Sequence, residues 1–480
     1  MSARRFLALL FAGAAAAAVA GPACRKTAPP ALTRAMAADL KRPAEEWLRE
    51  EPVRLLRDYI RIETTADKGE REGVEFLRRF FECDDIATEI VCPAPGRCNI
   101  LARLPGKSRE GALLLLNHVD VADVYPSGWK DAPPFEGKIQ QGFLYGRGTF
   151  DMKSLGLVQA LAIRHLKRHG IVPESDILFL GEADEEGGQK WGSRWLLQNR
   201  RDWFSGVAAV LNEGGTNEMI LRDVRYWGLE TVQAGYGLLQ FQAASRDPLE
   251  QLAKSRAKLP GDPVAAPHPH VEEAFQILAN HLSHPYTDPL RHLDRVRRDP
   301  KELAMLPDRY GSFLESRVHW SEIYPYPATR PPRMRDYVVV STPPGIAPDP
   351  YLESMKREAR DRGIEIVTDF SSGATIASPY PTPFTRLLRR VTADRYPGTP
   401  FGPMPMFGGV TTSNHFRREN FAAYGYSPIP MNITDMARRH GNDERIYLRD
   451  YLNGVLLFDE VLEEFAFTPR KKMSPPEPGR

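Results

Sequence analysis

The sequence predicts an α/β protein whose main domain is a doubly wound, mostly parallel sheet and which carries a smaller, inserted α+β domain. Up to about residue 225, short apolar runs alternate with segments of helical spacing. Runs that are apolar at every position are typical of strands buried on both faces, as in a parallel sheet covered by helices. From Tyr226 to Gly373 the order of elements changes, and the first pattern then resumes, which predicts an insertion.

The main domain opens with helical spacing between about Ala44 and Phe81, where apolar residues recur on one face. Short apolar runs then predict strands, and longer periodic segments predict helices. In order, these elements are the strands Thr88–Val91, Asn99–Leu104 and Leu113–Leu116, a helix after Asp151, the strand Asp176–Leu180, a helix through Trp195–Leu197 and the strand Val207–Leu211.

The insertion is predicted to be a small α+β sandwich. It contains one long excursion rich in proline and arginine, Pro285–Pro332. Within the insertion we expect strands at Glu230–Ala234, Leu238–Ala243, Tyr337–Ser341 and Ile364–Val367, and helices at Val271–Leu282 and Tyr351–Arg360.

The doubly wound pattern resumes after the insertion, with the helix Thr382–Asp394 and the strand Phe421–Tyr426. The end of the chain is charged and rich in proline, which predicts a disordered tail. The predicted boundaries are therefore 44–225 and 374–470 for the two parts of the main domain, 226–373 for the insertion and 471–480 for the tail.

The composition indicates a globular protein without a polyelectrolyte partner. The chain has 480 residues, of which 42% are hydrophobic and 26% are charged, enough for two domains or for one domain with a large insertion. The 64 Lys and Arg residues nearly balance the 62 Asp and Glu residues, which gives a net charge of +2. Nothing in this charge suggests nucleic acid as a partner.

Residues 1–23 are predicted to be a bacterial export signal. Arg4 and Arg5 precede the apolar, alanine-rich segment Phe6–Ala20, which ends in small residues typical of a cleavage site. The segment also resembles a twin-arginine signal and, at Cys24, a lipoprotein processing site. A periplasmic or secreted protein and a membrane-anchored lipoprotein are therefore both kept as predictions. No later apolar run approaches the roughly 20 residues that span a bilayer.

Three further cysteines are present. In an oxidising compartment Cys92 and Cys98 could close a small disulfide, with Cys83 as a rival partner. The sequence alone does not choose between these pairings. No pair has the CxxC spacing of a structural zinc ribbon.

Polar clusters follow several of the apolar runs and turns. His118 and Asp120 come directly after the strand Leu113–Leu116, and a glycine-rich turn delivers Asp151 to the start of a helix. In open α/β sheets, residues just beyond the carboxyl ends of the strands converge on one crevice, where ligands bind. We therefore expect one edge of the sheet to collect His118, Asp151, Glu185, Glu186, Glu213 and His440.

Taken singly, each of these residues is more often a solvated charge, a helix N-terminal residue or a surface histidine than a ligand. Together they place four carboxylates in one site, and like charges that share a site repel strongly without cations. Two imidazoles and three carboxylates form a nitrogen and oxygen ligand set that suits zinc, with cobalt or manganese as alternatives. The combination therefore predicts a site for divalent metal ions.

The chain carries ordered motifs: His118-Val119-Asp120, Trp129 with Pro134-Phe135-Glu136-Gly137, Tyr145-Gly146-Arg147-Gly148-Thr149 with Asp151-Met152-Lys153, Asp184-Glu185-Glu186-Gly187, Asn212-Glu213-Gly214, and His440 with Asp443-Glu444. In these motifs nearly all of the chain after the export signal resembles the dizinc aminoacylase and carboxypeptidase metallopeptidases. That family includes glutamate carboxypeptidase, acetylornithine deacetylase and succinyl-diaminopimelate desuccinylase. The likeness is greatest to its aminoacylase and carboxypeptidase S branch.

This resemblance implies a metal-dependent hydrolase that cleaves an amide bond in a peptide or an N-acyl amino acid, of carboxypeptidase, dipeptidase or aminoacylase type. It also implies two bound zinc ions. Their ligands would be His118 and Glu213 for one ion, Glu186 and His440 for the other, and Asp151 as a bridge between them.

The resemblance implies two further catalytic roles. Asp120 would accept the second ring N–H of His118 and thereby fix its tautomer. Glu185, next to a ligand but not itself coordinated, would be the general base that takes a proton from water and passes it to the leaving amine.

In relatives the inserted domain is a lid that carries a histidine for the oxyanion. Here Ala244-Ser245-Arg246 stands where that histidine is expected. His268 or His270 is the nearby substitute, and otherwise His415 takes this role or the chain works without it. Arg417 is the candidate for a displaced substrate anchor. We expect the insertion to be a mobile lid, through which the chain could also form a homodimer.

Two other kinds of protein compete with this hydrolase. The alternative function is that of a non-catalytic, periplasmic relative that binds metal and acts as a binding or scaffold module. Glu185 argues against it, because a pure binding protein has no need of an unligated base beside the metal ions. A serine hydrolase is disfavoured because the chain contains no Gly-x-Ser-x-Gly motif.

Overall fold

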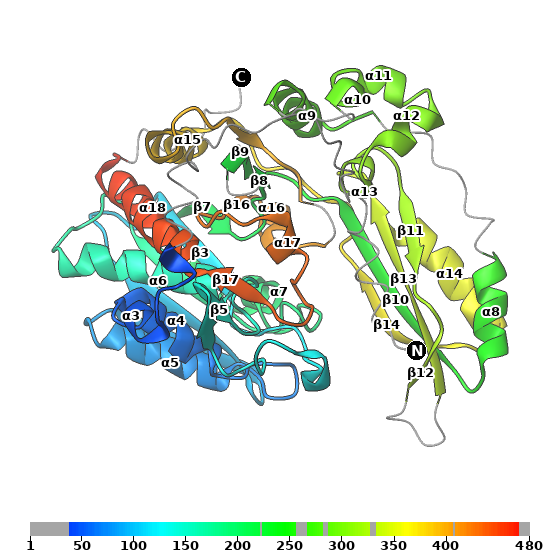
Figure 1. Ribbon diagram of the computed structural model, residues 1–480, viewed down its shortest axis with the longest axis horizontal. Coiled ribbons are helices and arrows are strands. Elements are labelled where there is room, and N and C mark those ends of the chain that lie inside the picture. Colours follow the sequence, from blue (N-terminus) through cyan, green and yellow to red (C-terminus); the bar gives the residue numbers. More distant parts are fainter. Residues whose placement is uncertain are drawn as a thin grey trace, which may run out of the picture. The chain divides into compact units, whose positions relative to one another are not determined.

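The computed structural model describes residues 38–220, 223–255, 266–281, 287–326, 333–406 and 409–469 (Figure 1). The predicted export signal, Cys24 and the predicted tail lie outside the described residues. The chain forms two compact units. Unit A consists of residues 38–205 together with Pro428–Pro469, and unit B lies within Gly206–Ser427.

Unit A begins with three helices where the sequence predicted one helical stretch. They are α3 (Ala44–Trp47), α4 (Glu51–Ile60) and α5 (Arg71–Glu82). Pro52 lies in the first turn of α4. Proline is accepted there but not inside a helix, so the chain breaks between α3 and α4.

The main sheet of unit A contains β1 (Ala87–Ala94), β2 (Arg97–Leu104), β3 (Ala112–His118) and β6 (Ile177–Glu182). β3 pairs in parallel with β6, and β2 pairs antiparallel with both β1 and β6, so β2 alone runs against the other three. Every residue of β3 and β6 is buried, as their continuous apolar runs predicted. The helix α6 (Lys153–Arg168) packs against β3 and β6, and α5 packs against β1 and β2.

A second sheet of unit A was not predicted. It consists of β4 (Lys138–Gln140), β5 (Phe143–Tyr145) and β17 (Arg445–Tyr447), with β5 in the middle and both pairings antiparallel. β17 leads into the helix α18 (Leu448–Phe467), which packs on α6. The pairing of β5 with β17 brings together two segments that lie far apart in the sequence. The remaining elements of unit A are η2 (Pro126–Gly128), α7 (Ser193–Asn199), η3 (Arg201–Phe204) and α17 (Ile433–Met436).

Unit B contains a parallel pair of strands, β7 (Val207–Asn212) and β16 (Ala422–Gly425). It also contains two helices. The helix α15 (Pro383–Arg395) corresponds to the predicted helix Thr382–Asp394, and α16 spans Ser413–Arg418. A small sheet has the order β15-β9-β8. Its strands are β8 (Asn217–Ile220), β9 (Asp223–Leu229) and β15 (Phe401–Pro403).

The predicted insertion contains an antiparallel sheet in the order β11-β13-β10-β14, with β12 paired to β13. The helices α8 and α14 pack against this sheet, and side chains such as Phe241, Val340 and Leu352 form a shared buried core. The bounds are β10 (Gly235–Ala243), α8 (Arg246–Lys254), β11 (Arg317–Trp320), β12 (Tyr324–Tyr326), β13 (Arg333–Thr342), α14 (Asp349–Asp361) and β14 (Glu365–Ser371).

One prediction for the insertion is wrong. The strand Glu230–Ala234 does not form, because Glu230 pairs with Gly425 and Gln233 pairs with Met406 through isolated bridges to separate segments. Within the predicted excursion, the described residues 287–326 form helices and strands, and apolar residues among them, such as Leu290, pack with α9 in a second core. Its elements include α10 (Thr287–Arg291), α11 (Leu293–Val296), α12 (Pro300–Met305) and α13 (Asp308–Gly311), after α9 (Pro269–His281).

The architecture agrees with the predicted α/β class. The parallel pairings of β3 with β6 and of β7 with β16 belong to the main domain, and the antiparallel sheet belongs to the insertion. Over the described ranges, no helix combines the length and the apolar character that a bilayer span requires.

Candidate metal centre

His118 is the last residue of β3 and stands where the apolar run ends. Its Nδ1 atom is 2.9 Å from the backbone oxygen of Asp120, and its Nε2 atom is 3.0 Å from Oδ1 of Asp151. A carbonyl oxygen can only accept, so the neutral ring carries its proton on Nδ1 and turns the lone pair of Nε2 toward Asp151. Two acceptors at this distance require a cation or a second proton between them.

Asp120 differs from its predicted role in one respect. Its carboxylate was expected to accept the N–H of His118, but Oδ1 lies 3.6 Å from Nδ1, and the nearer backbone carbonyl takes that hydrogen bond instead. The carboxylate accepts the backbone N–H groups of Glu185, at 3.2 Å, and of Glu186, at 2.9 Å. Asp120 therefore orients both the histidine and the segment that carries the two glutamates.

Asp151 lies between two histidines and is 5% exposed. Its Oδ1 atom is 3.0 Å from Nε2 of His118, and its Oδ2 atom is 3.1 Å from Nε2 of His440. Each carboxylate oxygen thus faces a different imidazole. This is the arrangement expected of a carboxylate that bridges two metal ions.

His440 also lies close to Glu186, with 2.8 Å between its Nε2 atom and Oε1 of the glutamate. This Oε1 atom is buried and, within the described part of the chain, has no partner in hydrogen-bond geometry. Burying a carboxylate charge is costly unless a cation lies close to it. Two ligand atoms that face each other without a hydrogen bond fit a cation held between them.

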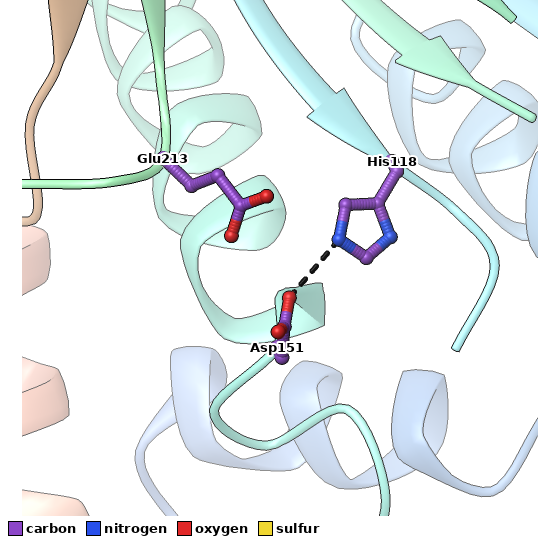
Figure 2. A group of neighbouring side chains, drawn as sticks. All are labelled: His118, Asp151 and Glu213. Carbon is purple, nitrogen blue, oxygen red and sulfur yellow. Dashed lines mark hydrogen bonds and ion pairs between the residues drawn. The ribbon is translucent and has the colours of Figure 1, made fainter. Parts of the chain in front are cut away.

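The side chains form two candidate ligand groups that share Asp151. In each group one ligand atom from every residue lies within 4.8 Å of the others. Figure 2 shows the first group, in which His118 and Glu213 lie beside Asp151. The second group contains Asp151, Glu186 and His440. Nitrogen and carboxylate oxygen donors suit Zn²⁺, Co²⁺ or Mn²⁺, so the residues present fit two divalent metal ions.

The charges of this centre favour proton binding when no metal is bound. Burial would raise the pKa of Asp151, but interactions with the imidazoles of His118 and His440 hold that pKa well below its usual value. Burial also opposes the charged form of His440, but the carboxylates of Glu186 and Asp151 raise its pKa to about 10. The metal-free protein therefore carries a proton on His440 at neutral pH.

Zinc binding at pH 7 is expected to release the proton of His440, because the metal needs the neutral imidazole. Zinc affinity should therefore fall as the pH falls further below about 10, the pKa of this group. Calorimetric titration of the metal-free protein with Zn²⁺, in buffers of different ionisation enthalpy, measures the number of protons released. His440→Ala should lower that number, whereas binding heats that do not depend on the buffer would contradict the prediction.

Glu185 precedes the ligand Glu186 in sequence but belongs to neither ligand group. Asp120 accepts its backbone N–H, and its own Oε1 atom accepts a hydrogen bond of 2.9 Å from Nε2 of Gln189. Both the backbone and the side chain of Glu185 are thus oriented by specific partners. An oriented carboxylate next to a ligand is placed to accept a proton.

A buried ion pair that the sequence did not predict ties together the two segments that carry Asp151 and His440. Arg147 and Glu444 are 2% and 0% exposed, and their side chains form a hydrogen-bonded ion pair. Arg147 also donates to the backbone oxygen of Gly441, next to His440. Glu444 accepts the backbone N–H of Phe150, next to Asp151. The arginine in the glycine-rich turn and the glutamate after His440 were visible, but nothing in the sequence shows that they pair.

Arg147→Met is expected to destabilise the protein by about 3–5 kcal/mol, because it leaves the carboxylate of Glu444 buried without its cation. Burial already raises the pKa of Glu444, and Arg147 opposes that rise. Denaturant unfolding of the metal-free protein measures the loss. The double variant Arg147→Met with Glu444→Gln should recover part of it, and additive effects of the two substitutions would argue against the pairing.

Arg417 has a different role from the predicted one. The candidate substrate anchor is only 3% exposed and forms an ion pair of 2.7 Å with the fully buried Glu230. It also donates to the backbone oxygen of Ala423 in β16. The side chain of Glu230 lies next to Gly214: a Cβ added to that glycine would be 3.3 Å from its Cγ atom and 3.5 Å from its Cβ atom. Arg417 therefore supports the turn that follows Glu213.

The three candidate oxyanion histidines lie in unit B. His270, in α9, has its Nδ1 atom 3.0 Å from the hydroxyl of Thr231, and its backbone N–H donates to Nδ1 of His268. Burial lowers the pKa of His270 to about 4 and also lowers that of His268, so both rings are neutral at pH 7. His415 lies in α16. None of the three belongs to a ligand group, and their role in catalysis stays a prediction.

Comparison with known proteins confirms the resemblance drawn from the motifs. The model of peptidase family M20/M25/M40 matches residues 114–464. The chain is similar to the N-fatty-acyl-amino acid synthase/hydrolase PM20D1 of Xenopus tropicalis, with 25% identity over 447 residues that cover 83% of this chain and 82% of that protein.

Solved structures share the fold. The di-peptidase Dug1p from Saccharomyces cerevisiae matches with a TM-score of 0.68 and 15% identity, over 90% of this chain and 99% of that one. Human carnosine dipeptidase 1 matches with a TM-score of 0.66 and 17% identity, over 90% of this chain and 100% of that one.

Proposed function

Since the chain belongs to peptidase family M20/M25/M40 and is a metallopeptidase or amidohydrolase, we propose that it cleaves an amide bond in a peptide or an N-acyl amino acid with the help of two metal ions. The observation that carries this proposal is the position of Asp151. One of its oxygens faces His118 and the other faces His440, so a single carboxylate serves both ligand groups.

Bound divalent ions supply Lewis acidity, which makes water a better nucleophile and a carbonyl group a better electrophile. The ligands of one ion would be His118 and Glu213, and those of the other Glu186 and His440. Zinc is the ion we propose, since the donors are nitrogen and oxygen and their number leaves room for water and substrate.

Glu185 is the proposed general base. It accepts the proton of the attacking water and later donates it to the leaving amine, so that the amine departs in a neutral form. The support for this role is the orientation of Glu185 by Asp120 and Gln189, and its absence from both ligand groups. Gln189 is a neutral donor, which leaves the carboxylate able to take up a proton.

A hydrolysis screen of the zinc-loaded protein tests the proposed function. The substrates are dipeptides and N-acyl amino acids, and the named activity of the relative from Xenopus tropicalis makes N-fatty-acyl amino acids the first of these to try. We expect release of a free amine that a chelator abolishes and zinc restores. Zinc binding without hydrolysis of any substrate would favour the alternative, a non-catalytic binding or scaffold module.

The protein is further proposed to act outside the cytoplasm, as the segment Arg4 to Ala20 suggests. Cell fractionation should find a mature protein that lacks the residues up to about Ala20 or Ala23, and metabolic labelling with a fatty acid tests whether Cys24 is lipidated. A cytosolic protein that begins at Ser2 would contradict export.

A further inference from the structure

The segment 183–191, which carries Glu185 and Glu186, is fastened at both ends by one buried side chain of the neighbouring strand. Asn99 in β2 is 0% exposed. Its Oδ1 atom accepts the backbone N–H of Ala183 at 2.9 Å, and its Nδ2 atom donates to the backbone oxygen of Trp191, also at 2.9 Å. Asn99 therefore links the first and last residues of this loop to β2.

Asn99 directly follows one half of a disulfide. Cys92 and Cys98 form the predicted bond and leave Cys83 as an exposed free cysteine, which settles the alternative that the sequence left open. The bond joins β1 to β2 at a register shift between Val91 and Ala94, and Asn99 pairs with Val91. The disulfide thus holds the end of β2 in the place where the ladder is irregular.

Arg97, on the other side of Cys98, fastens the same hairpin to the segment before α5. Its guanidinium forms an ion pair of 2.7 Å with the fully buried Glu70 and donates to the backbone oxygen of Ala66 at 2.8 Å. The backbone oxygen of Gly96 accepts the N–H of Glu70 at 2.9 Å. The hairpin tip and the segment 66–70 are therefore held together by three hydrogen bonds.

Thr64, two residues before the segment 66–70, forms hydrogen bonds with the two neighbours of Asp120. The hydroxyl of Thr64 donates to the backbone oxygen of Val119 at 2.8 Å, and the N–H of Val121 donates to the backbone oxygen of Thr64 at 3.1 Å. Thr64 thus holds the residues on both sides of Asp120. The Asp120 carboxylate in turn accepts the N–H groups of Glu185 and Glu186.

Charge gives Arg97 a second effect on this region. The carboxylates of Glu70, Asp120 and Asp184 repel one another, while Arg97 attracts all three. Burial raises the pKa of Glu70 to about 7, and Arg97 opposes that rise. Loss of the guanidinium would favour protonation of Glu70 and would leave the repulsion between Asp120 and Asp184 without this compensating charge.

We propose that Asn99 and Arg97 are positioning residues for the loop of Glu185 and Glu186, and that the Cys92–Cys98 disulfide between them makes this positioning depend on oxidation. In the oxidised hairpin, Arg97 lies against Glu70 and Asn99 lies against the backbone of Ala183 and Trp191. Reduction frees the end of β2, so the base and the neighbouring ligand lose part of their orientation. The catalytic half of this proposal rests on the proposed function of Glu185, whereas the effect on metal binding does not.

The test compares oxidised and reduced wild-type protein in the presence of zinc and a water-soluble phosphine. Cys92 is exposed and therefore accessible to the reductant. The phosphine gives two electrons to the S–S bond, and water supplies the oxygen of the phosphine oxide and the two protons of the thiols. We expect kcat to fall roughly 10- to 100-fold, because misplaced catalytic groups lower the rate by about this factor, and KM to change little. Zinc should also be lost more readily to a chelator.

Matched variants separate positioning from other effects of the reductant. Cys83→Ser should keep the full response, and the double variant Cys92→Ser with Cys98→Ser should match the reduced wild type and ignore the phosphine. Arg97→Gln should lower kcat, and Arg97→Lys should restore part of it. Asn99→Asp, which keeps the acceptor for Ala183 but loses the donor for Trp191, should retain more activity than Asn99→Leu, which loses both.

Three outcomes would overturn the proposal. The first is a reduced wild type that keeps its kcat and its zinc. The second is a response that Cys83→Ser abolishes. The third is a loss of activity that accompanies unfolding at the assay temperature, seen by circular dichroism, since the disulfide would then stabilise the fold as a whole. If the oxidised protein hydrolyses no substrate but releases zinc more readily on reduction, the proposed function fails and the positioning of Glu186 stands.

Discussion

Glu185→Gln is expected to retain its metal ions and its fold and to lose most of its turnover, by roughly 10² to 10⁴-fold. Glutamine has nearly the same shape as glutamate but cannot accept a proton. The side chain belongs to neither ligand group, so the metal content should not change. The backbone N–H that Asp120 accepts is also unaffected by the substitution. A rate measurement on the zinc-loaded variant, with metal analysis of the same sample, checks the prediction.

Glu72→Gln provides the matched control. Glu72 is an exposed acid in the first turn of α5, so the same chemical change there should leave the rate unaltered. The pH dependence adds a second criterion. The acidic limb of kcat should disappear in Glu185→Gln if that limb reports the ionisation of the base. A variant with nearly wild-type turnover would assign the base to another residue.

The sequence predicted the parts of the fold that local pattern controls. β3 and β6 are continuous apolar runs, and the structure buries every one of their residues. The ligands were also predictable, because their residue types and the ends of the strands limit where a metal centre can lie. The structure brings all of them into the two ligand groups.

The parts that the sequence did not predict depend on contacts between distant segments. β5 and β17 have three residues each, too few to show a period, and their pairing joins the turn before Asp151 to the segment after His440. The ion pair of Arg147 with Glu444 depends on the same juxtaposition. Arginine and glutamate are mostly exposed residues, so their types alone favoured the surface.

Two other differences between prediction and structure have different causes. The helix α18 has apolar residues such as Val455, Phe458 and Leu462 at helical spacing and could have been predicted from them. Arg417 could not have been assigned, because its partner Glu230 lies far away in the sequence and in a segment that was expected to be a strand. A charged residue near a predicted site is therefore weak evidence for substrate binding until its partners are known.

Asp151→Asn is expected to lose both metal ions, because Asp151 is the one residue that the two ligand groups share. Asparagine keeps the volume of the buried side chain but removes its negative charge, and one of its two oxygen ligands becomes an amide nitrogen that cannot coordinate. Turnover should fall with metal content.

Glu186→Gln is the informative comparison, since Glu186 belongs to only one group, and it should retain the ion held by His118 and Glu213. Metal analysis after exhaustive dialysis should therefore give less than one ion per chain for Asp151→Asn and about one for Glu186→Gln. Asp58→Asn, the same change at an exposed position of α4, should keep the wild-type content. If Asp151→Asn kept two ions, the carboxylate would not be a bridge, and each ion would have to be held by the remaining ligands of its own group.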